Sequence, residues 1–488
     1  MRYARRSGAG RRHGAKAGRA VSASRNGSSN YVGHSTNLPC PIEPRRVVLV
    51  RHGQSTFNAQ GRIQGSSNES LLTERGQEQA HHVQRILAGV HFDCLFKSPL
   101  ERASHTADII WNNRSGNVTS LYGLREIDLF SFEGMLKSEG KRLFGDAFAT
   151  WQSDPANFVI DGRMPVPELW ERARTCWDDV LDSNASSILL VAHNAVLQAL
   201  VCTALGVGPS YFRHLLQSNC GVSVLDFGPP EIAGDPCVVI ERLNETPSFP
   251  TRSEAPRSPG GRLVIVVHGQ DEAEAESKIA GSDNGVSLSG AGVTQSSALA
   301  GELSDSGVES ILYSPQARAR ETADAIADNL RGFGNMCERS GLNDISLGQW
   351  EGRRKEDVLQ EDRKRAILWL EGALQAEAPG GEPLHSLFER AQGELREAFR
   401  EFERGRETVA MVTHTAVARA LLCCALGMDE QVFRRFRADE GSVSVVDFQA
   451  DRTATCRNTN FTAHLQEHAR DVNVPSAGVP VAAAGADF

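Results

Sequence analysis

Four histidines in this sequence directly follow short apolar runs, a placement in which they could do chemistry. His52 and His193 lie in the first half of the chain, and His268 and His414 lie in the second half. Because the carboxyl ends of parallel strands in an open α/β sheet meet at one ligand-binding edge, we expect the two histidines of each half to lie close together. Histidine is one of the side chains that form covalent intermediates, so such a pair indicates group transfer.

The neighbours of His52 indicate which group would be transferred. Arg51 precedes it, Asn58 follows shortly after, and Arg102 begins a predicted helix after the strand-like DCLFKSP. Two guanidinium groups and an amide are donors that suit phosphoryl oxygens. Nearby cations also lower the pKa of His52 and hold the imidazole neutral, as a nucleophile must be. The sequence therefore predicts a phosphoryl-transfer site around His52.

These residues belong to an internal repeat. VVLVRHGQ (47–54) returns as LVIVVHGQ (263–270), 216 positions later, and this shift holds without an insertion as far as residues 322–323. Farther along, the offset drifts by a few residues, as loops allow: LLVAHNAV matches AMVTHTAV, and GVSVLDF matches SVSVVDF. Repetition over this length predicts two copies of one fold.

The elements that must position these residues are strands and helices in alternation. Short apolar, β-branched runs alternate with helical patterns, which is typical of an α/β fold with a mostly parallel sheet covered on both faces by helices. The clearest strands are Arg46–Val50 and Ile188–Ala192, and Leu72–Leu87 is predicted to be an amphipathic helix opened by a threonine cap. His81 and His82 in that helix are interpreted as part of its solvated face.

The domain organisation follows from the repeat and from composition. A chain of 488 residues is longer than one hydrophobic core usually fills. A Pro/Ser/Gly-rich stretch without apolar periodicity separates the two copies. We predict a basic leader at 1–42, a catalytic domain at 43–246, a linker at 247–261, a second, degenerate domain at 262–468 and a disordered tail at 469–488.

Charge is unevenly distributed along the chain. The leader has eight Lys/Arg and no Asp/Glu, while the rest has 44 basic and 61 acidic residues, a formal net charge of −17. An acidic body argues against nucleic acid as a partner, and no apolar run is long enough to span a bilayer. The leader, rich in Ser, Ala and Gly, fits an organellar transit peptide, with a plain disordered basic tail as the alternative.

The ten cysteines show no spacing typical of a zinc or redox site. They are interpreted as reduced thiols, mostly buried.

Four motifs in order carry a resemblance to a known family. With these motifs the chain resembles the histidine phosphatase (phosphoglycerate mutase-like) superfamily, over roughly residues 45 to 465. The motifs are RHG at Arg51–Gly53, SPLERASHTA at Ser98–Ala107, LREI at Leu124–Ile127 and VAHN at Val191–Asn194.

The resemblance implies a division of labour among the residues of the first copy. His52 would attack phosphorus to give a phosphohistidine, and Glu126 would protonate the leaving alkoxide and then activate water, as microscopic reversibility requires. No metal or organic cofactor would be needed. The phosphoryl oxygens would be held by Arg51, Asn58, Arg102 and His193.

The second copy departs from this pattern. Val267 takes the place of Arg51 and Glu274 that of Asn58, and Glu272 and Glu276 add two more carboxylates to a loop that should face an anion. We predict that this copy is weakly active or inert and serves as a scaffold, as a regulatory pocket or to complete the first site. The residues that stay in register are His268, Arg318, Asp344 and His414, with Lys278 in place of Arg62.

Further sequence motifs narrow the resemblance to one branch of the family. GRIQGSS, EIDLFSFEGMLKSEGK and LLQSNCGVSVLDF look like a plant chloroplast branch of the family that dephosphorylates a tight-binding sugar-phosphate inhibitor of Rubisco. The resemblance implies a small phosphorylated sugar or sugar acid as substrate, a stromal location and an indirect link to Rubisco. Positive side chains that could meet a substrate carboxylate or second phosphate are Arg62, Lys137, Lys141 and Arg163.

Three other functions stay open at this point. One is hydrolysis of other sugar bisphosphates such as xylulose 1,5-bisphosphate, and another is a mutase that returns the phosphoryl group to its substrate. The third is a sugar-phosphate-binding sensor with the second copy as its recognition module.

Overall fold

The structure is a computed structural model that describes Leu38, Pro41 and residues 43–228, 238–247, 249, 260–330, 334–370 and 377–465. Except for Leu38 and Pro41, the predicted leader lies outside the described residues, as do the predicted tail and most of the predicted linker. Both copies fall within one compact unit of the chain.

Within the described residues, the strands form one sheet in the order β3-β2-β4-β1-β5-β6-β12-β11-β7-β10-β8-β9. The strands of the first copy are β1 (Arg45–Arg51), β2 (Cys94–Lys97), β3 (Asn117–Ser120), β4 (Ser187–Ala192), β5 (Val222–Phe227) and β6 (Val238–Glu245). Those of the second copy are β7 (Arg262–Val267), β8 (Ser310–Tyr313), β9 (Asn335–Glu338), β10 (Thr408–Thr413), β11 (Val443–Phe448) and β12 (Ala454–Phe461).

Pairing within the sheet is the same in both copies. β3, β2, β4 and β1 run parallel to one another, and β5 and β6 continue the sheet antiparallel. β9, β8, β10 and β7 repeat the parallel part, followed by antiparallel β11 and β12. β6 and β12 pair antiparallel at Leu243 and Thr459, which joins the two copies. The predicted fold class is confirmed, with antiparallel strands at the centre that the sequence patterns did not distinguish.

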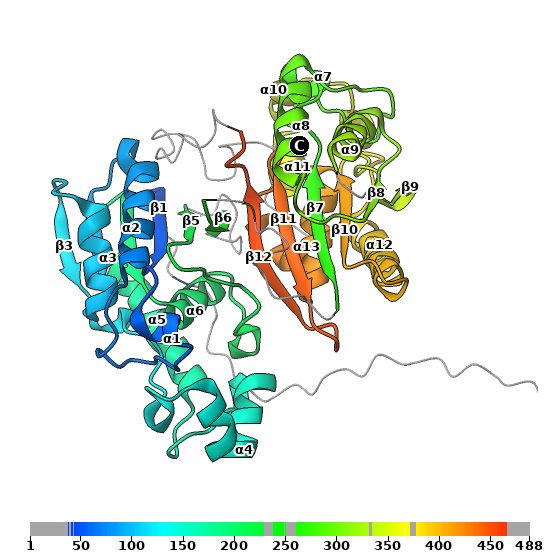
Figure 1. Ribbon diagram of the computed structural model, residues 1–488. Coiled ribbons are helices and arrows are strands. Elements are labelled where there is room, and N and C mark those ends of the chain that lie inside the picture. Colours follow the sequence, from blue (N-terminus) through cyan, green and yellow to red (C-terminus); the bar gives the residue numbers. More distant parts are fainter. Residues whose placement is uncertain are drawn as a thin grey trace, which may run out of the picture. The chain divides into compact units, whose positions relative to one another are not determined.

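Helices cover both faces of the sheet. Alternate residues of β1 face opposite sides: Val47 and Leu49 belong to one hydrophobic cluster, and Val48 and Val50 to another. Figure 1 shows α2 and α3 beside β1 of the first copy, and residues of α5 and α6 belong to the cluster on the other face. The helices of the first copy are α1 (Thr56–Gln60), α2 (Glu74–Ile86), α3 (Glu101–Trp111), α4 (Lys137–Ser153), α5 (Pro165–Leu181) and α6 (Asn194–Ala204). Those of the second copy are α7 (Glu272–Ala275), α8 (Gly290–Leu303), α9 (Ala317–Asn329), α10 (Lys355–Glu361), α11 (Arg363–Leu370), α12 (Leu384–Glu403) and α13 (Thr415–Leu426).

The start of α2 packs closely on the turn after β1. A Cβ atom added at Gly53 would lie 2.2 Å from the carbonyl oxygen of Gly76, and one added at Gly76 would lie 2.1 Å from that of Gln54. The same approach recurs in the second copy between Gly269 and Gly292. Only glycine therefore fits after His52, because both neighbours are backbone atoms that no rotamer change can move.

We expect Gly53→Ala to lower the free energy of unfolding by about 1–3 kcal/mol and to displace the adjoining His52, because overpacking against backbone forces the chain apart. Urea unfolding measures the loss. Gly89→Ala is the matched control, since nothing lies within 4 Å of a Cβ atom there. Equal stability of the two variants would contradict the close approach.

Two further features bear on the class of protein. In the part of the chain that the structure describes, no helix is long and apolar enough to cross a membrane. The eight cysteines among the described residues are all free thiols, and six of them are buried, in agreement with the interpretation from spacing.

Candidate active site

The two histidines of the first copy lie together at the carboxyl edge of the sheet. β1 ends at Arg51 and β4 ends at Ala192, so His52 and His193 leave the sheet side by side. Their ring centroids are 5.1 Å apart in an edge-to-face arrangement. The histidine rings thus meet as the strand positions predicted.

The hydrogen bonds of His52 fix its tautomer. Its Nδ1 lies 2.7 Å from the carbonyl oxygen of Gly53, which can only accept, so Nδ1 carries the proton. The lone pair of the neutral ring is then on Nε2. Burial lowers the pKa of His52 well below 6.5, and the charges of Arg51 and Arg102 lower it further. The sequence predicted the effect of the cations, whereas burial is the larger cause.

Three buried nitrogens around His52 have no hydrogen-bond acceptor within the described part of the chain. They are Nε of Arg51, Nε of Arg102 and Nδ1 of His193. The Ser98 hydroxyl lies 2.7 Å from Nε2 of His193, and when it donates to that nitrogen, Nδ1 carries the proton. Buried donors are rarely left unsatisfied, so their convergence indicates an anionic ligand.

The other donors of the two arginines hold them in place. Nη1 of Arg51 donates to the carbonyl oxygen of Gln217 at 2.7 Å. Arg102 is fully buried and donates to the carbonyl oxygens of Ser67 and Gly65 at 2.7 and 3.0 Å. Burial lowers the pKa of Arg102 to about 10, so the side chain stays charged near neutral pH. Each arginine is a fixed cation whose Nε–H has no acceptor among the described residues.

Glu126 reaches the site from the loop after β3 and binds the first turn of α6. Its Oε1 accepts from the backbone nitrogens of Ala195, Val196 and Ile127 at 3.0 to 3.1 Å. Burial lowers the pKa of Arg51 and of Arg102, and the charge of Glu126 partly offsets this effect, which places the carboxylate near both. The side chain is thus oriented beside the cationic cluster.

Asn58 is tied to the site through a residue that sequence reasoning missed. Asn219 Nδ2 donates to the carbonyl oxygen of His52 at 2.9 Å and to Oδ1 of Asn58 at 3.3 Å. Asn58 also completes the capping box of α1 with Ser55. The motif LLQSNCGVSVLDF was available as a signal, because it precedes β5 next to β1, but antiparallel pairing was not predicted.

The four other positive side chains are not bonded to this cluster in the described structure. Arg62 donates to the carbonyl oxygen of Gly134 and to Gln60, and Arg163 forms an exposed ion pair with Glu168. Lys137 and Lys141 are exposed on α4. A role for them in substrate binding stays a prediction.

Four buried histidines make stability depend on pH. Burial lowers the pKa values of His52, His193, His268 and His414 below 6.5. The unfolded chain therefore takes up protons that the folded chain does not, as pH falls through 6.5. Stability from these groups is complete above that pH, and each loses about 1.4 kcal/mol per pH unit below it. Burial raises the pKa of Asp344 to about 6, so this group takes up a proton in the folded chain and offsets part of the loss of stability.

We expect urea unfolding to show a lower free energy at pH 5.5 than at pH 7.5. His193→Asn should reduce the pH dependence by about one proton, whereas His81→Asn, at an exposed position on α2, should leave it unchanged. A free energy that rises on acidification would contradict neutral buried imidazoles.

In the second copy the nucleophilic position is blocked. Nδ1 of His268 bonds the carbonyl oxygen of Gly269, as in the first copy, but Nε of Arg318 donates to Nε2 of His268 at 3.2 Å. The same Nε also lies 3.2 Å from the carboxylate of Asp271. The lone pair that should attack phosphorus is therefore engaged, and the arginine N–H that should hold phosphate is satisfied by the protein.

Asp344 does not reproduce the geometry of Glu126. Being one methylene shorter, it accepts from the backbone of Ile345 and lies 3.3 Å from Nη2 of Arg318. His414 keeps the bond to a serine hydroxyl, that of Ser314 at 2.9 Å, and packs edge-to-face on His268 with centroids 4.9 Å apart. The fold of the site is preserved, while Nε of its arginine is engaged by His268 and Asp271.

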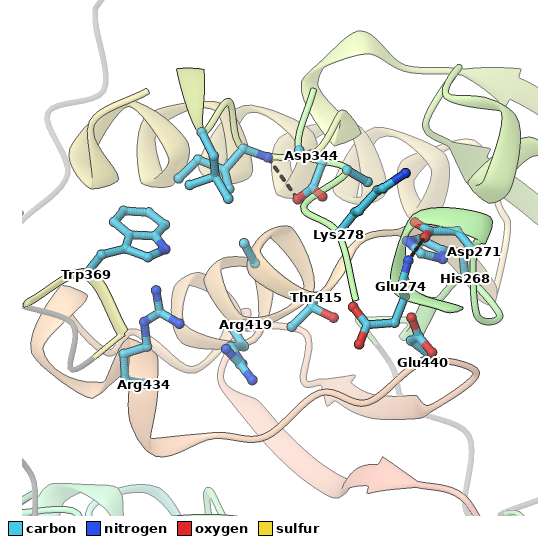
Figure 2. A pocket seen from close by; sticks show the side chains of 15 residues that line it. His268, Asp271, Glu274, Lys278, Asp344, Trp369, Thr415, Arg419, Arg434 and Glu440 are labelled. Atoms are coloured by element: carbon cyan, nitrogen blue, oxygen red, sulfur yellow. Dashed lines mark hydrogen bonds between the residues drawn. The ribbon is translucent and has the colours of Figure 1, made fainter. Parts of the chain in front are cut away.

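The second site carries carboxylates at positions where the first site has neutral side chains. Of the three carboxylates predicted on the loop, Glu272 and Glu276 are exposed, and Glu274 lines the cavity at His268. Glu440 lines the same cavity at the position of Asn219. Figure 2 shows this cavity, with His268 at the end where Glu274 and Glu440 lie.

Comparison with known proteins agrees with this geometry. The sequence model of the histidine phosphatase superfamily (branch 1) matches residues 47–233 and again residues 263–461. The chain belongs to the histidine phosphatase superfamily. Both copies are thus domains of this superfamily.

Relatives of this histidine phosphatase include proteins of the same length and proteins of one copy. It is 41% identical to 2-carboxy-D-arabinitol-1-phosphatase of Triticum aestivum, over 88% of each chain. It is 40% identical to a probable 2-carboxy-D-arabinitol-1-phosphatase of Arabidopsis thaliana, over 88% of this chain and 90% of that one. A probable phosphoglycerate mutase of Salmonella typhi is 33% identical over 37% of this chain and 85% of its own.

Proposed function

We propose that this histidine phosphatase hydrolyses 2-carboxy-D-arabinitol 1-phosphate through a phosphohistidine at His52. The observation that carries the catalytic part is the convergence of three unsatisfied buried nitrogens on a neutral imidazole whose Nε2 is open. The substrate is supported by the two plant relatives, which match nearly the whole chain at 40 and 41% identity.

The first step forms the bond between Nε2 of His52 and phosphorus and breaks the bond from phosphorus to the substrate oxygen. Charge that develops on the phosphoryl oxygens meets the N–H groups of Arg51, Arg102 and His193, which are already in place. Glu126 gives a proton to the leaving alkoxide.

In the second step, Glu126 takes a proton from water, and the resulting nucleophile attacks the phosphohistidine. Inorganic phosphate leaves, and His52 returns to its neutral form. The bonds from Ala195, Val196 and Ile127 to Glu126 orient the carboxylate for both proton transfers.

The test is phosphate release from a panel of esters by the full chain. The panel holds 2-carboxy-D-arabinitol 1-phosphate, xylulose 1,5-bisphosphate and 3-phosphoglycerate, each also tried with His52→Ala. We expect the highest kcat/KM with the first ester and no release from the variant. A higher kcat/KM with xylulose 1,5-bisphosphate would replace the proposed substrate and leave the mechanism intact.

A mutase is the second candidate, favoured by the phosphoglycerate mutase-like relative. A mutase keeps its phosphohistidine long enough for the product to reorient, whereas a hydrolase passes it to water. Incubation with a phosphate monoester, primed by a trace of its bisphosphate, separates the two: stoichiometric free phosphate supports the hydrolase, and an isomerised monoester without free phosphate supports the mutase. Binding without turnover on every ester would favour the sensor instead.

We also propose a chloroplast stromal location and, through the substrate, an indirect link to Rubisco. The location is supported by a leader with eight basic and no acidic residues. A fluorescent fusion to residues 1–42 tests it, because import into chloroplasts is expected and a diffuse cytosolic signal would count against it.

A further inference from the structure

A cavity lies at His268, where Nε of Arg318 is engaged by protein groups. All of the residues that line it belong to the second copy. Figure 2 shows two unlike ends, with Arg419, Arg434 and Trp369 at one and the carboxylates near His268 at the other. Such convergent polar groups around a cavity are typical of small-molecule sites.

The positive end is built from α13 and the loop after it. Arg419 lies one turn into α13, 7% exposed, where the first copy has Gln198. The guanidinium of Arg434 lies over the Trp369 ring, 5.0 Å from its centroid. Two arginines, one of them held flat on an aromatic wall, suit a carboxylate.

The first turn of α13 also lines the cavity. Thr415 and Ala416 line the cavity. In the first copy the carboxylate of Glu126 binds the equivalent turn, whereas Asp344 is drawn to Arg318 and Ile345. A ligand carboxylate would take the place that the shorter Asp344 leaves, where the helix dipole favours negative charge.

The other end offers carboxylate oxygens as hydrogen-bond acceptors, and Lys278 lines the cavity beside them. Asp271 pairs with Arg318, and Glu274 pairs with Lys355. Because these carboxylates already have cationic partners, they suit neutral hydroxyl groups better than an ammonium group. Near neutral pH a phosphate group has at most one proton to donate. Its other oxygens would therefore face the carboxylate oxygens at this end.

We propose that this cavity binds a polyhydroxylated carboxylic acid that carries no phosphate. Its carboxylate lies at Arg419 and Arg434, and its hydroxyls donate to Asp271, Glu274 and Glu440. The dephosphorylated product of the first copy belongs to this chemical class, a link that rests on the proposed function. The second copy would then bind the product type and reject the substrate type.

The test uses D-gluconate as the probe and a full chain with a disabled first site, His52→Ala with Arg51→Val. The second substitution copies the valine that stands at position 267 of the second copy. Calorimetry is expected to give one gluconate site per chain. D-glucitol, which lacks the carboxylate, should bind at least about tenfold more weakly, and inorganic phosphate should not displace gluconate.

Arg419→Gln in the same background should weaken gluconate binding at least about tenfold. Glutamine is the residue that the first copy carries at this position, so the helix can accommodate it. Arg400→Gln, at an exposed site on α12, is the matched control and should bind as before. Should Arg419→Gln not fold, Glu440→Gln tests the hydroxyl end in the same way.

Three results would overturn the proposal. One is no gluconate binding at millimolar concentrations, a second is equal affinity for D-glucitol, and a third is displacement of gluconate by inorganic phosphate. Because the background cannot turn over substrate, each of these results is independent of whether the proposed phosphatase activity is found.

Discussion

His52→Ala is expected to lower phosphate release at least about a thousandfold, because the variant lacks the nucleophile and the remaining donors only bind substrate. The structure leaves Nε2 of His52 open, with Nδ1 bonded to Gly53 and the ring neutral. Steady-state release measures the loss. Acid-labile labelling of the chain by a radioactive phosphate ester should disappear with it.

His268→Ala is the matched control for this prediction. Nε2 of His268 accepts from Arg318, and the second copy has no counterpart of Arg51. The His268→Ala variant should therefore keep at least about half of the activity. Label that persists in His52→Ala and disappears only when His268 is also replaced would show that the second copy is the active one.

Glu126→Gln is expected to lower kcat about 10²–10⁴-fold with little change in KM, because an amide cannot transfer the proton. The amide oxygen can still accept from Ala195 and Val196, so the fold of α6 should be kept. With 4-nitrophenyl phosphate, whose leaving group needs no proton, the defect in the first step should be smaller.

Two further variants sharpen the result. Glu126→Asp copies the shorter side chain of Asp344 and should turn toward Arg102, as Asp344 does toward Arg318, with a loss close to that of the glutamine variant. Glu101→Gln removes an exposed carboxylate beside Arg102 and should change kcat less than about twofold. An equal defect of Glu126→Gln on both kinds of leaving group would argue against its role as an acid.

The chain repeat and the strand-end histidines were readable from residue order alone. Positions 216 apart carry the same residue types through the first part of each copy, and this register identified His268 and Arg318 as counterparts of His52 and Arg102. The loss of the arginine at position 267 was visible in the same way. Local patterns suffice here because strand ends and helix starts are set by neighbouring residues.

Residues brought in by antiparallel pairing were not readable. Asn219 contacts the backbone of His52 from 167 positions away, because β5 runs antiparallel beside β1. Its counterpart Glu440 was missed for the same reason, although it adds a carboxylate to the second cavity. Strand order depends on which faces pack together, and a single sequence does not specify it.

The sequence by itself determined the two copies, their fold class and the residue types that suit phosphoryl transfer. Only the tertiary structure decided that Arg102 keeps an N–H for a ligand whereas Arg318 gives its own to His268 and Asp271. Both arginines read alike along the chain. A donor is available or consumed according to which acceptors the fold brings within about 3 Å, and that distance is set by packing across the whole sheet.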